Sequence, residues 1–136
     1  MRKVFLLAAL LLAAVVASAQ TYVGTLRVEN RSTKDVWVKM TTQGDTATLL
    51  LYRVEISSLT NGPVNLVIPD IRVTKGEMQR THLQCLNIDP LIAGAPVKEY
   101  RVKRLSGAVA ASTLSFSCIM DGKRVTFQGV ITRRAE

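Results

Sequence analysis

The chain has 136 residues, a formal net charge of +8 at pH 7 and a hydrophobic content of 48%. This length is enough for one domain to bury its own core, so the fold needs neither a structural metal nor several disulfides. The basic charge favours association with anionic surfaces, but it identifies no mechanism.

Residues 1–19 have the features of a cleavable secretory signal peptide. A basic start at residues 2–3 precedes an apolar run from Val4 to Ala17, and a small-x-small motif ends at Ala19, where cleavage is expected. The apolar run has about 14 residues, fewer than the roughly 20 of a transmembrane helix. No cysteine follows it directly, as a lipoprotein would require. We therefore expect a soluble exported protein, periplasmic or secreted, with no transmembrane segment after cleavage.

Residues 20–136 are then the mature protein, which we expect to be a single domain and a monomer. Loss of the two basic residues of the leader lowers the net charge from +8 to +6. Basic side chains are densest at 98–104, and the candidate contacts there for an anionic envelope component are Arg101, Lys103 and Arg104. No specific nucleic-acid partner is expected.

The chain has two cysteines, Cys85 and Cys118, which would enter an oxidising compartment. A disulfide between them would close a loop of roughly 30 residues and contribute about 3 to 4 kcal/mol. The alternative is two buried free thiols on separate strands, because cysteine also behaves as a small hydrophobic residue. The sequence leaves both readings open.

After Thr21 the sequence alternates apolar and polar residues, and Gly, Asn, Asp or Pro interrupts it at short intervals. A first strand is predicted over about 22–29, with an inward face of Tyr22, Gly24, Leu26 and Val28. A polar turn at 30–34 leads to a second strand that alternates Val36, Val38 and Met40 with Trp37 and Lys39.

A third strand is predicted over about 46–56. Its inward residues are expected to be Leu50, Tyr52, Val54 and Ile56, opposite Arg53 and Glu55. Leu49 and Leu51 are then placed on the outer side, where they would be available to a partner. In the next strand, between Val64 and Val73, the apolar parity changes at Pro69-Asp70, which predicts a β-bulge or an edge.

The segment 78–88 is ambiguous, because two parities compete for the core. Leu83 and Cys85 lie on one of them, while the other holds Met78, His82, Leu86 and Ile88. A loop is expected from Asp89 to Pro96, followed by a strand in which Tyr100 and Val102 alternate with basic residues.

The last part of the chain predicts a β-hairpin. Asp121-Gly122 supplies a tight turn. The inward residues of the two arms are expected to be Leu114, Phe116, Cys118 and Met120, then Val125, Phe127 and Ile131.

About eight strands joined mostly by short turns, with no crossover helices, predict an all-β fold of one domain, either a barrel or a sandwich. Two glycines favour an antiparallel up-and-down barrel. Gly24 and Gly129 lie inside the first and last strands, which must meet when a barrel closes, and glycine within a strand often marks bending or close backbone approach.

The sequence resembles the calycin-like, or lipocalin-like, small barrel proteins exported by Bacteroidetes-type bacteria. The residues that carry the resemblance are 22–26 after the leader, 49–52, 105–109, 120–123 and 127–129. The resemblance implies an eight-stranded barrel of largely unassigned function. The glycine-x-tryptophan signature of animal lipocalins is absent, because Leu26 stands where it would have tryptophan.

No catalytic site is predicted. The one histidine, His82, has no serine elbow or cysteine-histidine signature around it and no second histidine to share a metal. The acidic residues are scattered as turn formers or on outward strand positions, so no facing carboxylate pair is expected. We therefore expect a protein that is not an enzyme and uses no cofactor or metal.

Two functions remain. In the first, a small apolar or amphipathic ligand is held in the barrel, and the candidate lining residues are Tyr22, Leu26, Val38, Tyr52, Phe116, Met120 and Phe127. In the second, the barrel is a scaffold whose outer face contacts a protein, glycan or anionic lipid. The candidate surface contacts for this function are Trp37, Leu49, Leu51, Arg101, Lys103 and Arg104.

Overall fold

The computed structural model describes residues 18–55, 62–76 and 80–132. The predicted leader, apart from its last two residues, therefore lies outside the described residues, as do Ile56 and Met78. Within the described ranges, no helix is long and apolar enough to cross a bilayer.

The described chain is almost entirely β-strand. The strands are β1 (Ser18–Val28), β2 (Arg31–Gln43), β3 (Thr46–Val54), β4 (Val64–Lys75), β5 (Arg80–Ile88), β6 (Leu91–Ile92), β7 (Ala95–Pro96), β8 (Val102–Ala110), β9 (Thr113–Met120) and β10 (Lys123–Ile131). One 3-10 turn, η2 (Lys98–Tyr100), precedes β8.

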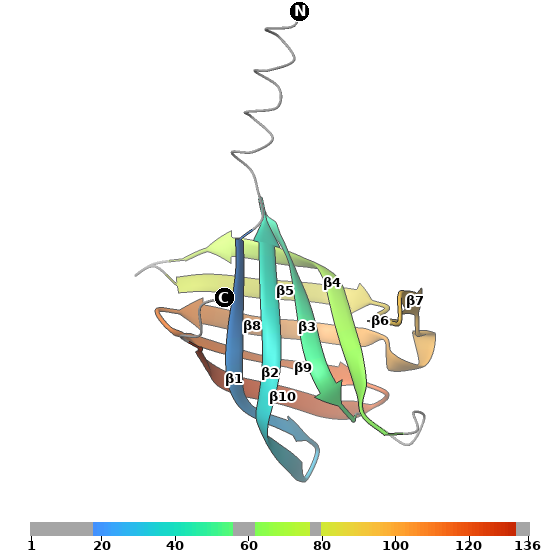
Figure 1. Ribbon diagram of the computed structural model, residues 1–136. Coiled ribbons are helices and arrows are strands. Elements are labelled where there is room, and N and C mark those ends of the chain that lie inside the picture. Colours follow the sequence, from blue (N-terminus) through green and yellow to red (C-terminus); the bar gives the residue numbers. More distant parts are fainter. Residues whose placement is uncertain (1–17, 56–61, 77–79, 133–136) are drawn as a thin grey trace, which may run out of the picture.

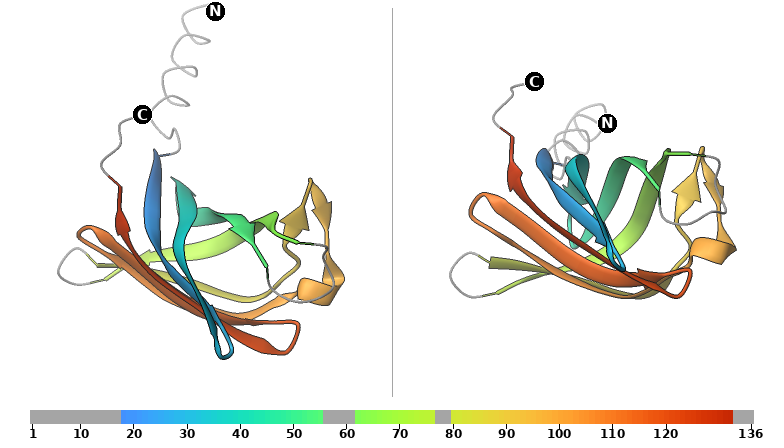
Figure 2. Two further views of the ribbon diagram at one scale, coloured as in Figure 1. Left: turned by 60° about the horizontal axis from the view of Figure 1, so that its bottom comes forward. Right: turned by 90° about the horizontal axis from the view of Figure 1, so that it is seen from below.

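Eight of these strands close into an antiparallel barrel, as the sequence predicts. The order is β3-β2-β1-β10-β9-β8-β5-β4, and β4 pairs with β3 to complete the ring. In Figure 1, β1 to β4 run steeply across β5, β8, β9 and β10, which lie behind them. Figure 2 shows this second group of strands curving beneath the first. The apolar side chains of both groups meet between them.

The barrel closes where the first strand pairs with the last. Tyr22 lies opposite Ile131, and Gly24 lies directly opposite Gly129, as the two glycines predicted. A Cβ atom added to Gly24 would overlap the carbonyl oxygen of Gln128. The strands can approach this closely only because glycine has no side chain.

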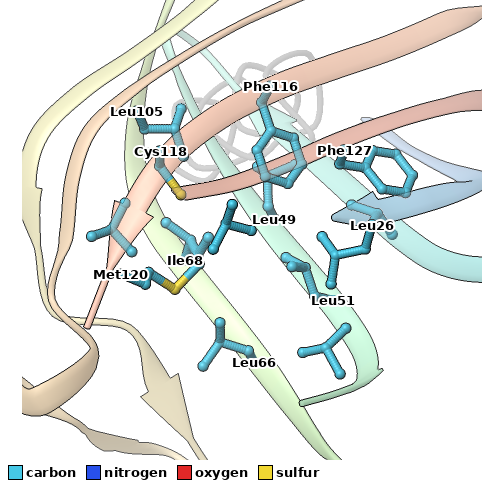
Figure 3. Close-up of a cluster of buried hydrophobic side chains, with 14 of the residues drawn as sticks. Leu26, Leu49, Leu51, Leu66, Ile68, Leu105, Phe116, Cys118, Met120 and Phe127 are labelled. Atoms are coloured by element: carbon cyan, nitrogen blue, oxygen red, sulfur yellow. The ribbon is translucent and has the colours of Figure 1, made fainter. Parts of the chain in front are cut away.

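The final hairpin has the predicted geometry. Asp121 and Gly122 both have positive φ, 52° and 71°, which is the signature of a type I′ turn. The inward residues of β9 are buried, and Phe116 stacks on Phe127 of β10 with ring centroids 5.6 Å apart. This pair forms one side of the barrel core (Figure 3).

The predicted facing of β3 is wrong for its first part. Leu49 and Leu51 are 0% exposed and point into the core among Phe116 and Phe127 (Figure 3). Tyr52, by contrast, is only half-buried. The reason is Arg53, whose φ of 52° accompanies a register shift against β4. The extra residue reverses the alternation, so the inward position of Val54 does not extend back to Tyr52.

The bulge predicted in β4 is present. Asp70 has a φ of 56°, and Ala47 and Leu49 of β3 pair with Ile71 and Ile68, so β4 holds an extra residue there. Ile68 and Ile71 are both 0% exposed, although their spacing in sequence is odd. Because of the extra residue, Ile68 and Ile71 both face the core.

The segment between β5 and β8 differs from its prediction. Instead of a featureless loop, residues 91–96 form a small hairpin, β6–β7, that pairs with β4 through Leu66 and Val67. Tyr100 belongs to the 3-10 turn rather than to a strand, although it is fully buried. In β5 the ambiguity resolves in favour of Leu83, which is buried, while His82 is exposed.

Candidate binding groove on the outer face

The interior of the barrel is packed with apolar side chains. Among the described residues, 23 hydrophobic side chains are buried and no polar or charged residue is. Ligand sites usually place a few polar groups in a mostly apolar cavity to fix the orientation of the ligand. In the described interior, hydroxyl groups come only from the buried tyrosines Tyr22 and Tyr100.

The candidate lining residues mostly take their expected inward positions. The six that are buried are Tyr22, Leu26, Val38, Phe116, Met120 and Phe127. Tyr52 does not join them, for the reason given above. Burial raises the pKa of the Tyr22 hydroxyl, which donates a hydrogen bond to Oε1 of Gln20 at 2.7 Å.

A groove of about 620 Å³ lies on the outer face of the sheet formed by β5, β8, β9, β10, β1 and β2. It is larger than two further surface cavities of about 400 Å³ each. The residues that line it are Thr25, Arg27, Ser32, His82, Ser106, Gly107, Ala108, Ser115, Phe116, Ser117, Thr126, Phe127 and Gln128.

The register of the strands explains how these distant residues meet. Ser106, Ser117, Thr126, Arg27 and Ser32 stand side by side in one row across five strands. Ser117, Thr126 and Arg27 each stand between two buried residues, so their side chains point away from the barrel axis. The row is polar along its whole length.

A second row runs parallel to the first, two residues further along each strand. It contains His82, Ala108, Ser115, Gln128 and Thr25. Small side chains occupy β8 and β9 in the middle of the groove, whereas longer ones stand on β5, β10 and β1. The outer surface is depressed there because the side chains of serine and alanine are short.

The groove is rich in hydroxyl groups, and none of the described residues that line it carries a carboxylate. Its hydroxyl residues are Thr25, Ser32, Ser106, Ser115, Ser117 and Thr126. Within the described part of the chain, none of these hydroxyls makes a side-chain hydrogen bond. Among the described lining residues, the ionisable ones are Arg27 and His82. Four strand spacings, or about 19 Å, separate their strands.

An apolar row borders the groove. Trp37, Val23 and Val130 lie opposite one another on β2, β1 and β10. Trp37 is 38% exposed and Val130 is 52% exposed, so both are accessible from outside. Of the apolar surface contacts expected from the sequence, only Trp37 is on the surface, because Leu49 and Leu51 belong to the core.

The basic cluster before β8 is partly neutralised. Arg101 donates from Nε to Oδ1 of Asp89 at 2.7 Å, and this hydrogen bond lowers the pKa of that carboxyl. Arg101 and Lys103 line one of the smaller cavities, but Glu99 and Asp121 line it too. Arg104 is exposed with a φ of 53° and does not line that cavity. The cluster is thus less suited to an anion than the groove.

Cys85 and Cys118 are free thiols in the structure. They lie on β5 and β9 with β8 between them, about 10 Å apart at two strand spacings. A disulfide usually needs Cα atoms within about 7 Å, so these backbone positions do not permit a bridge, and of the two alternatives that the sequence left open the structure shows free thiols. Burial is the main cause that raises the pKa of Cys118 to about 12 and also raises the pKa of Cys85.

His82 stands alone on the rim of the groove. It lies above Gly76, where an added Cβ would contact its Nε2. Within the ranges that the structure describes, no three His, Cys, Asp or Glu side chains gather in a way that could hold a metal ion. The described lining of the groove thus offers hydrogen-bonding hydroxyls together with the side chains of Arg27 and His82.

The groove was missed from the sequence. Its serines and threonines look like the ordinary polar half of an alternating strand, and Arg27, Ser106 and Ser117 are far apart in the chain. The available signal was the unusual number of small hydroxyl residues on the outward positions of 113–117 and 126. Only the register shows that they form one surface.

Comparison of the chain with protein-family models, curated protein sequences and solved structures found no match.

Proposed function

We propose that the mature chain is a non-enzymatic recognition module that binds its partner on the outer face of the barrel. One observation carries this proposal: the barrel interior is filled by its own side chains, while a groove of about 620 Å³ lies outside it. That volume falls within the range of known small-molecule sites, about 300–1,000 Å³. The barrel then serves as a rigid scaffold.

The chemistry of the groove supports recognition rather than catalysis. Hydroxyl groups on neighbouring strands offer donors and acceptors at fixed spacing, since the hydrogen-bonded strands hold their positions. His82 and Arg27 lie on strands separated by three others, so they cannot act together on one reacting atom.

A tryptophan placed inside the groove tests this function. Ser117 lies near its centre, so Ser117→Trp would fill it without adding charge. The matched control is Thr48→Trp, a half-buried residue of β3 that does not line the groove. Immobilised proteins would be incubated with an envelope fraction of the native cell, and the retained material measured. We expect retention by the wild type and Thr48→Trp and its loss in Ser117→Trp.

Equal retention by all three proteins would overturn the outer-face proposal. The rival function, a small apolar or amphipathic ligand inside the barrel, predicts a different result. Native mass spectrometry of protein purified from its own cell would then show a bound mass that persists in Ser117→Trp. For the proposed function, any bound mass should disappear in that variant.

We also propose that residues 1–19 direct export and that the domain is a calycin-like barrel of the kind exported by Bacteroidetes-type bacteria, soluble and monomeric in the periplasm or outside the cell. The tripartite leader and the eight-stranded closed barrel support this. N-terminal sequencing of the protein from its native cell should begin at Gln20. A chain that retains Met1 would contradict cleavage.

A further inference from the structure

We infer that the ligand of the outer groove is an acidic polysaccharide, held by hydroxyl pairing along the groove and by Arg27 at its anionic groups. The inference rests on the proposed function and assigns a ligand class to the same site. It follows from three properties of the lining: its unpaired hydroxyls, its length and its charge.

The hydroxyls favour a ligand that can both donate and accept hydrogen bonds. A serine or threonine hydroxyl offers one donor and two acceptor positions, and the amide of Gln128 also offers both. An apolar ligand that covered six such hydroxyls would leave them without hydrogen-bond partners, which is unfavourable for each of them. The hydroxyls of a sugar chain have the same dual character, so they can pair with the whole row.

The shape of the groove suits an extended chain. From His82 on β5 to Ser32 on β2 the lining crosses five strand spacings, about 24 Å. This length exceeds a single sugar unit. The groove is open along the face of the sheet, so a polymer can pass across it without a chain end.

The charge of the groove selects an anionic ligand. Arg27 is exposed and has no ion pair with a described residue, and its guanidinium can bind a carboxylate or a sulfate in a bidentate manner. In the next row outward, Lys103 and Arg124 are exposed on either side of Ile119. The exposed Glu29 lies beside Arg124, whose backbone N–H donates to its carboxylate, so it offsets part of the positive charge of that row. Among the described residues that line the groove, there is no Asp or Glu to oppose an anion.

A single-stranded nucleic acid fits this surface less well, although it is also anionic and polyhydroxylated. Such ligands generally stack their bases on exposed aromatic side chains. The two aromatic residues that line the groove, Phe116 and Phe127, are 3% and 1% exposed, and their rings stack on each other inside the barrel. Their outer contribution to the groove is therefore backbone.

Calorimetric titration with defined polymers tests the inference. Polygalacturonate supplies carboxylates, dextran sulfate supplies sulfate esters, and dextran is the neutral reference. We expect at least one of the two anionic polymers to bind and dextran to bind at least about tenfold more weakly. Arg27→Gln should weaken binding of the anionic polymer by about tenfold or more, as expected for a charge-assisted hydrogen bond. Arg27→Lys should recover part of the loss.

Two controls separate specific binding from general charge attraction. Arg72→Gln removes an exposed arginine of β4 that lies outside the groove, so binding should stay within about twofold of the wild type. Ser117→Trp leaves the charge unchanged, yet it should abolish binding. Far-UV circular dichroism would confirm that each variant keeps its strand content.

Several outcomes would overturn the inference. One is binding of dextran as tight as that of the anionic polymers, and another is binding of polyuridylate, titrated as a single-stranded nucleic acid, that is tighter than binding of both anionic polymers. A loss of affinity in Arg72→Gln equal to that in Arg27→Gln, or unchanged binding by Ser117→Trp, would also overturn it. Failure of both anionic polymers to bind would also overturn it. If Ser117→Trp then still abolished retention of envelope material, the proposed function would stand and only the ligand class would be wrong.

Discussion

Cys118 is a buried ionisable side chain, with only 3% of its surface exposed. Its thiol lies in the core between Leu105 and Met120 (Figure 3), and burial raises its pKa from 9.0 to about 12. Burial favours the neutral thiol, so the folded state resists its ionisation. A reactive or metal-binding role, which needs the thiolate, does not suit this residue.

This shift predicts a pH dependence of stability. A raised pKa in the folded state contributes stability that is complete below pH 9 and is lost as pH rises towards 12. Between pH 8 and about pH 11, the wild type should therefore lose on the order of 2 kcal/mol more free energy of unfolding than Cys118→Val. Urea unfolding at both pH values measures this difference. The same loss in both proteins would show that other groups cause it.

Gly24 limits the distance between the two strands that close the barrel. Gly24→Ala would place a methyl group against the carbonyl oxygen of Gln128, a backbone atom that cannot rotate away. We expect the free energy of unfolding to fall by about 3 kcal/mol. Gly44→Asn is the control, because Gly44 has open space around it and asparagine tolerates its positive φ of 65°. Equal stability of the two variants would show that β1 and β10 can move apart to accommodate the added methyl group.

At the scale of elements, the bulges decide which residues face the core. The Pro69-Asp70 bulge could be predicted, because a proline and a change of parity occur together in the sequence. The bulge at Arg53 could not, because arginine is an unusual residue for a φ of 52° and the apolar run 49–52 fits either facing of the strand. The wrong facing of Leu49 and Leu51 follows from this single residue.

Arg53 offers a direct test of the bulge. Glycine adopts positive φ without strain, so Arg53→Gly should leave stability unchanged or raise it by up to about 1 kcal/mol. Arg53→Val should lower it by about 1–3 kcal/mol, since a β-branched residue is strained there. The control is Arg27→Gly, at an exposed strand position without positive φ, which should be destabilising. Thermal unfolding of the three variants would show whether the order holds.

At the scale of the whole molecule, the fold was far more predictable than the site. Alternation identifies inward residues such as Leu26 and Phe127 within one strand, because the chain itself carries the period of two. The groove depends instead on which strands are neighbours and on the register between them. Arg27 meets Thr126 and Ser117 only after the barrel has closed, so no local pattern could reveal their row.

Because the interior is packed, truncating a core side chain should create a cavity and lower the stability of the barrel. Phe127→Ala removes a ring that is 1% exposed and should lower the free energy of unfolding by about 3–5 kcal/mol. The resulting apolar cavity should bind benzene, as engineered dry cavities do. Benzene should therefore raise the unfolding midpoint of Phe127→Ala and leave that of the wild type unchanged. An equal rise in the wild type would reveal an open cavity in the native barrel.

The seam between β1 and β10 also sets the order of events in biosynthesis. Tyr22 pairs with Ile131, so the first strand to emerge from the ribosome must wait for the last one. Until then β1 has one unpaired edge, and every contact across the seam requires closure of a loop that spans almost the whole domain. Translation alone cannot finish this barrel strand by strand. The barrel therefore stays open until β10 has been synthesised.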